Sequence, residues 1–154
     1  MEKEQSNFVA LAEKCKAEVM SLARYIPWLE SSARKQVSDS YGGDDLPNSI
    51  HFPVYDANLM QFVKEASRTS FMNRNHPYVY TRNHINGAED ELRLIRNATM
   101  KDWEILCGIL SHYVLIGMRR GDVWTQGVSN GVFLETLMKM KELVLFWAEK
   151  EAKA

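Results

Sequence analysis

This sequence of 154 residues is poor in cysteine and has neither a long apolar run nor an excess of charge of either sign. Its two cysteines, Cys15 and Cys107, fall on the apolar faces of helix-like segments, where a reduced cysteine packs as a small hydrophobic side chain. No segment approaches the roughly 18 uninterrupted apolar residues of a membrane span. The charged first 25 residues lack the apolar core of a secretory signal. We therefore expect a cytoplasmic protein that makes no membrane contact.

The balance of charge limits the classes of partner. Lys and Arg together number 19 and Asp and Glu number 20, so no global field recruits nucleic acid, and such contact must come from a local patch. Apolar residues make up 45% of the chain and charged residues 25%, which is typical of a globular protein. A chain of this length buries one core. We therefore predict a single helical domain over residues 1–154.

The sequence also lacks most of the common motifs of catalytic and metal sites. It contains no HExxH, CxxC, P-loop or GxGxxG pattern. Its four histidines have no metal-ligand spacing, and His112 has isoleucines around it at helical spacing, which favours a hydrogen-bonded core or interface residue. We predict no metal, no cofactor and no catalytic residue.

Two helices with an apolar period are expected in the first half of the chain, with a short helix at residues 33–37 between them. Apolar residues recur at steps of three and four from Ser6 to Ile26, and Pro27, which has no N–H to donate, ends or kinks this helix. Residues 38–53 are rich in Gly, Asp and Pro and should form a long surface loop. Asp56 can then cap the second helix. Its inward face should consist of Leu59, Phe62, Val63 and Ala66.

The second half is more continuously helical. Thr99 and Asp102 have the spacing of a helix start, and the segment after them is apolar on nearly every face, as a buried helix is. Gly121 is placed to end it. The buried helix should cover residues 103–118, and the other helical segments expected in this half are residues 89–96 and 130–150. The sequence predicts a mainly α fold, a single bundle of about five helices with at most a minor extended element near residues 49–55 or 78–85.

Four short pieces of the chain, in the same order, resemble a family of small bacterial and phage proteins that is catalogued only as a domain of unknown function. The pieces are residues 25–30 (YIPWLE), 41–44 (YGGD), 52–56 (FPVYD) leading to Phe62 and Val63, and 119–124 (RRGDVW). Together they cover most of the chain. The resemblance implies a small helical fold and brings no known substrate or catalytic residue.

The most unusual stretch is residues 66–88, which hold three arginines and two histidines but no Asp or Glu. If its middle is extended, side chains alternate across the strand, and one face becomes cationic and aromatic. That face would carry Arg74, His76, Tyr78, Tyr80, Arg82 and His84. It could hold phosphates and stack bases. The alternative, which we favour, is an irregular segment whose tyrosines anchor it to the core and whose cations neutralise the acids of residues 89–91.

A second candidate region lies between the last two long helices. Arg119 and Arg120 precede residues 122–130 (DVWTQGVSN), which we expect to form a loop. Backbone N–H groups at the helix start that follows can receive an anion. Trp124 either stacks on a planar ligand or fills the core between the two helices, and the large area of a buried Trp favours the core.

We therefore expect a non-enzymatic interaction module of bacterial or phage origin that binds and modulates a macromolecular partner. A protein partner is favoured, and nucleic acid is the weaker one. The apolar stripe of residues 130–150 is wider than one neighbouring helix can cover, which suggests a homodimer through the C-terminal helix. The alternative is a nucleotide or nucleic-acid binding protein, or an enzyme, that uses residues 74–84 and 119–130.

Overall fold

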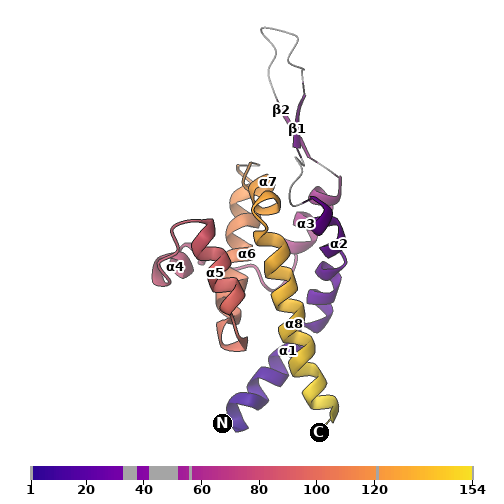
Figure 1. Cartoon of the computed structure of the whole chain (residues 1–154), viewed down its shortest axis with the longest axis vertical. Coiled ribbons are helices and arrows are strands. Elements are labelled where there is room, and N and C mark those ends of the chain that lie inside the picture. Colours follow the sequence, from indigo (N-terminus) through magenta and orange to yellow (C-terminus); the bar gives the residue numbers. More distant parts are fainter. Residues whose placement is uncertain (1, 33–37, 42–51, 56, 121, 154) are drawn as a thin grey trace.

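The computed structural model describes residues 2–32, 38–41, 52–55, 57–120 and 122–153 (Figure 1). The fold is mainly α, as predicted. The described ranges contain α1 (Glu2–Ala23), α2 (Ile26–Ser32), β1 (Ser38–Tyr41), β2 (Phe52–Tyr55), α3 (Ala57–Ala66), α4 (His76–Arg82), α5 (Ala88–Asn97), the single 3-10 turn η1 (Met100–Asp102), α6 (Trp103–Gly117), α7 (Asp122–Ser129) and α8 (Val132–Lys153). These are more helices than the five or so expected, because three short ones were not predicted. None of the described helices has the length and apolarity needed to cross a membrane.

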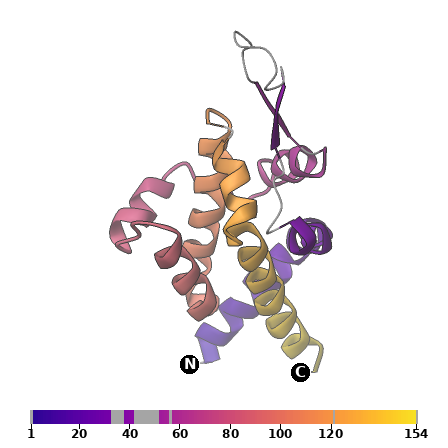
Figure 2. The same ribbon diagram turned by 45° about the horizontal axis from the view of Figure 1, so that its top comes forward.

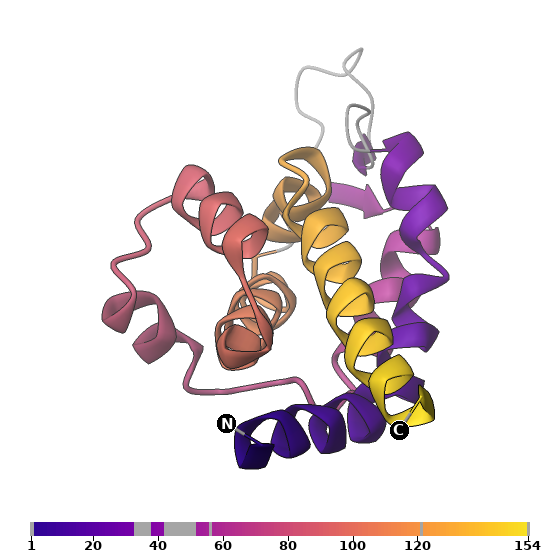
Figure 3. The same ribbon diagram turned by 60° about the horizontal axis from the view of Figure 1, so that its bottom comes forward.

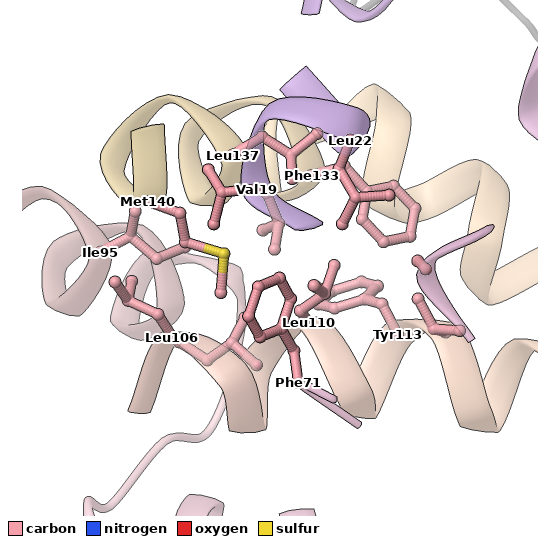
Figure 4. Close-up of a cluster of buried hydrophobic side chains, with 14 of the residues drawn as sticks. Val19, Leu22, Phe71, Ile95, Leu106, Leu110, Tyr113, Phe133, Leu137 and Met140 are labelled. Atoms are coloured by element: carbon pink, nitrogen blue, oxygen red, sulfur yellow. The ribbon is translucent and has the colours of Figure 1, made fainter. Parts of the chain in front are cut away.

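The long helices α1 and α8 pack side by side, with both chain termini at the same end of the molecule (Figure 1). The predicted stripe on α8 is confirmed over Phe133, Leu137, Met140 and Val144, all of which are fully buried. Figure 4 shows Val19 and Leu22 of α1 against this stripe. Near the termini, the rings of Phe8 and Trp147 meet edge to face with centroids 5.1 Å apart. This pairing covers one side of α8 within the chain.

Helix α6 runs through the centre of the core. Leu106, Ile109, Leu110 and Val114 are fully buried, which confirms the prediction of a buried helix. Its start is also as predicted, because the Thr99 N–H donates to Asp102 Oδ2 at 2.9 Å in a capping box. The helix ends at Gly117. The predicted stop, Gly121, lies outside the described residues.

The connection between α1 and α2 differs from the prediction. Helix α1 ends at Ala23, and Pro27 is the second residue of α2 rather than the terminator of the first helix. A proline is tolerated there because the first N–H groups of a helix have no intrahelical partner. The expected helix at residues 33–37 lies outside the described residues. The inward face predicted for α3 is confirmed, since Leu59, Phe62, Val63 and Ala66 are all buried.

Both described parts of the predicted loop over residues 38–53 belong to a two-stranded antiparallel sheet. β1 and β2 pair antiparallel, with Ser38 opposite Tyr55 and Tyr41 opposite Phe52. Figure 2 shows the two strands standing away from the helices. β2 falls where a minor extended element was expected, near residues 49–55. The other position offered for such an element, residues 78–85, is helical at its start instead.

Helices α4 and α7 are corrections to the prediction, which had an irregular or extended segment and a loop. α4 is seven residues long, too short to display a helical period in the sequence, and Pro77 occupies its first turn. α7 buries Val123, Trp124, Gly127 and Val128, which is a helical spacing hidden among polar residues. Trp124 lies over Gly117, where a Cβ atom would come within 1.9 Å of the indole. The close approach of α6 and α7 therefore requires glycine at this position.

Candidate functional site

A buried carboxylate joins the helices at the side of the core that faces α4. Glu91 of α5 is only 3% exposed. Each of its two carboxylate oxygens accepts a hydrogen bond from a tyrosine: Tyr80 Oη of α4 donates to Oε2 at 2.5 Å, and Tyr113 Oη of α6 donates to Oε1 at 2.5 Å. A buried carboxylate is costly unless its oxygens are hydrogen-bonded. The two hydroxyls supply those bonds from two different helices.

The network continues to the start of α8 through Asn130. Its Nδ2 donates to Tyr113 Oη at 3.1 Å, and its Oδ1 accepts from the backbone N–H of Val132 at 2.9 Å. The Tyr113 ring also meets Phe133 at 5.7 Å between centroids, on the apolar side of the same contact (Figure 4). The polar chain thus reaches from α4 through α5 and α6 to the first turn of α8.

Two histidines lie beside this carboxylate network. His76 Nδ1 of α4 and His112 Nδ1 of α6 are 3.4 Å apart. The Tyr80 ring stacks on the His112 ring with centroids 4.1 Å apart. His76 is buried and His112 is half-buried. His112 is therefore a partnered residue between two helices, as the sequence indicated.

Burial sets the protonation of the cluster. It lowers the pKa of His112 to about 4, with the neighbouring His76 as the second cause, and it lowers the pKa of His76 as well. Burial first and the Glu91 carboxylate second raise the pKa of Tyr80, and both causes also raise the pKa of Tyr113. At neutral pH both imidazoles are therefore uncharged, and both phenols keep the protons that they donate.

The single cationic and aromatic face that residues 74–84 would present if they were extended does not form. Because α4 is a helix, successive side chains turn by about 100° instead of alternating. His76 and Tyr80 point into the cluster, whereas Tyr78 and Arg82 are exposed on the outer side. Arg74 and His84 are exposed beyond the two ends of the helix.

Tyr78 and Arg82 line a groove of about 260 Å³ between α4 and the start of α6. The other charged residues that line the groove are one cation, Lys101, and two acids, Asp102 and Glu104. The groove therefore carries both positive and negative side chains and is not a basic surface.

The candidate residues at the second region also separate. Arg119 and Arg120 are exposed after the end of α6. Trp124 is buried, and its Nε1 donates to the Val114 carbonyl at 3.0 Å, so it fills the core between α6 and α7 as the favoured hypothesis had it. The groove at α4 is lined by residues 78–83 and 101–105 and includes none of these residues.

Residues 127–131 (GVSNG) match the GxSxG pattern of serine hydrolases. That pattern works as a sharp turn between a strand and a helix, which exposes the serine above a sheet. Here Ser129 is the last residue of α7, and the turn after it joins two helices. Gly131 has a φ of +82°, which glycine adopts without strain. The segment is thus a helix–helix connection.

The sequence did not single out Glu91 or Tyr113, and it indicated Asn130 only as the end of the second candidate region. Glu91 was expected to be a charge neutralised by nearby cations, whereas the structure pairs it with two hydroxyls. The available signal was its position four residues before Ile95, which puts an acid on the buried face of α5. No group of three His, Cys, Asp or Glu side chains capable of holding a metal ion occurs in the described ranges.

Comparisons with known proteins add no relative to this description. No protein-family model matches the chain, and neither the curated proteins nor the solved structures yield a match. The family resemblance noted in the sequence stays a prediction.

The carboxylate network predicts a specific loss of stability for Tyr80→Phe. The change leaves Glu91 Oε2 without a donor, so the free energy of unfolding should fall by about 1–3 kcal/mol. Tyr78→Phe is the matched control, because its hydroxyl is on the exposed side of the same helix and should cost less than about 0.5 kcal/mol. Urea unfolding measures both, and equal losses for the two variants would mean that the Tyr80 bond adds nothing.

Proposed function

We propose that this chain is a non-enzymatic interaction module of bacterial or phage origin that binds and modulates a protein partner. The observation that carries the proposal is the outward face of α8. Met138 and Phe146 are about half exposed there, at 47% and 52%. Leu134 and Leu145 lie half-buried beside them, because Leu134, Met138 and Leu145 follow at steps of four and seven, and Phe146 comes eight residues after Met138.

This outward patch, formed by Leu134, Met138, Leu145 and Phe146, adjoins the apolar stripe that α8 packs into the core, and Leu134 at its edge also packs against that core. Phe133, Leu137, Met140 and Val144 already meet partners within the chain. Exposed apolar side chains that gather on one helix face are typical of sites for protein contact. The homodimer hypothesis therefore rests on the outward patch, which contains Phe146, one of the apolar residues that extend beyond the stripe.

The charges around the patch favour a protein over a polyanion. Lys139 pairs with Glu142 at 3.3 Å on α8, and Arg96 of α5 pairs with Glu135 at 2.7 Å beside it. Both signs are interleaved at close range, so a phosphate backbone would meet carboxylates as often as cations. A protein surface with apolar anchors and a polar rim fits such a pattern.

Self-association is the simplest form of the proposal to test. We expect sedimentation equilibrium at micromolar concentration to give the mass of two chains, and Phe146→Glu to return it to one, because a buried carboxylate would oppose the apolar contact. Met60→Glu is the matched control, since Met60 is 44% exposed on α3 and lies outside the patch. It should leave the mass at two chains.

If the wild type has the mass of one chain, a second copy of this chain is excluded as the partner, and a different protein remains. Affinity capture with the wild type, Met138→Glu and Met60→Glu then decides the proposal. Of these three proteins, only Met138→Glu should fail to bind the partner. Capture that is the same with all three proteins contradicts the assignment of the patch.

A second candidate function is nucleotide or nucleic-acid binding by the outer side of α4. The observation that favours it is the exposure of Tyr78, 57%, one helical turn from Arg82 in the same groove. An exposed aromatic ring beside an arginine can stack a base and contact a phosphate. Glu104 and Asp102 in the groove oppose this function, which is why we place it second.

Reversing the charges on α4 tests this candidate. If a fluorescent single-stranded oligonucleotide binds at low salt, Arg74→Glu with Arg82→Glu should abolish the binding, and the affinity of the wild type should fall steeply with salt. The control is Arg119→Glu with Arg120→Glu, an equal charge change at exposed positions elsewhere. Equal losses from both double variants, or an absence of binding by the wild type, would reject the α4 surface.

A further inference from the structure

Helix α4 is attached to the rest of the molecule mainly along one side. Figure 3 shows it at the periphery, joined to α3 and α5 by stretches without regular structure. Val79 fits against Gly108 of α6, where an added Cβ atom would come within 2.7 Å of the valine side chain. His76 and Tyr80 complete the contact by meeting His112. Release of this seven-residue helix would also break the Tyr80–Glu91 hydrogen bond, whereas Tyr113 of α6 would stay bonded to the other Glu91 oxygen.

The two histidines in this contact can hold only one proton between their facing Nδ1 atoms. With Nδ1 atoms 3.4 Å apart, one imidazole can donate and the other must accept. If both rings are protonated, both nitrogens become donors, and two positive charges face each other between a buried ring and a half-buried one. Like charges at that distance oppose docking, and the hydrogen-bond acceptor is lost as well.

The charged and titratable groups around the pair do not compensate for two cations. On α4 the neighbour is Tyr80 and on α6 it is Tyr113, and both phenols donate to Glu91 of α5. The Glu91 carboxylate is therefore occupied on both oxygens. The charges at the other side of α4, Arg82, Lys101, Asp102 and Glu104, line the outer groove instead of the histidine contact. Asn73 and Asn75, in the turn before α4, are uncharged and bond to each other.

We propose that the His76–His112 contact is an acid-sensitive latch, which releases α4 from α6 when both imidazoles are protonated and leaves the bundle of α1, α6 and α8 folded. Release uncovers Val79, the notch at Gly108 and the inner face of α6 around them. The same chain would thus present a different surface in an acidic compartment or medium.

The direction of the pH dependence follows from proton binding. A free histidine has a pKa near 6.5, whereas docking lowers the pKa of His112 to about 4. Between these values the released state binds more protons than the docked state. Docking is therefore strongest above about pH 6.5 and weakens as the pH falls towards 4.

Hydrogen exchange of the full-length protein tests the latch. The amides of Asn83 and Ile85 donate to the carbonyls of Val79 and Tyr80, so their protection factors report whether this segment stays ordered. Between pH 7 and pH 4 we expect these factors to fall by about tenfold or more beyond any fall in α8. Loss of protection at the same pH in α4, α6 and α8 alike would show whole-chain acid unfolding and overturn the proposal.

Two variants test whether the acid-dependent loss of protection in α4 depends on the histidine pair. His76→Gln keeps a side chain that can hydrogen-bond but removes one of the two charges, so the acid-dependent fall should largely disappear. His84→Gln is the control, because His84 is exposed just beyond α4 and should leave the fall unchanged. A full-sized fall in His76→Gln contradicts the latch. If that variant does not fold, the comparison of α4 with α8 in the wild type still decides.

Discussion

The carboxylate of Glu91 is the constraint on which the arrangement of the helices outside the α1–α8 pair depends. It is buried without a cation, so its oxygens need donors that other helices must bring to it. Tyr80 and Tyr113 meet that need from α4 and α6, and Asn130 ties Tyr113 to the start of α8. Apolar contacts alone would allow α4 and α5 to slide against α6, because such contacts have little directionality. Two hydrogen bonds to one carboxylate fix their register.

Several helices have two faces with different roles, and the proposed function uses the outer ones. The inner side of α8 completes the core against α1, while its outer side keeps Met138 and Phe146 in contact with solvent. The inner side of α4 belongs to the network, and its outer side offers Tyr78 and Arg82 to the groove. Since the cluster is engaged with itself at neutral pH, the surfaces left for partners are these outer faces. The histidine pair connects the buried cluster with the outer faces, because its protonation is proposed to release α4 from α6.

Much of the fold could be predicted from the sequence wherever a helix was long enough to repeat its apolar positions. α3, α6 and α8 bury the residues that their spacing indicated, and the Thr99 and Asp102 pair starts the central helix by an ordinary capping interaction. α4 escaped prediction because seven residues span about two turns, and its cationic residues suggested an extended ligand-binding face. The same shortness hid α7. The polar network could not be predicted from spacing alone, since Glu91, Tyr80 and Tyr113 come from three helices whose packing only the tertiary structure defines.

The unfolding free energy of Glu91→Gln tests the account most directly. The amide has one oxygen and therefore one side-chain acceptor where the carboxylate has two, so at least one tyrosine hydroxyl loses its partner while the size of the side chain is kept. We predict a loss of about 1–3 kcal/mol relative to Glu89→Gln, the same change at an exposed position in the first turn of α5. Equal stabilities of the two variants would contradict a structure organised around the Glu91 carboxylate.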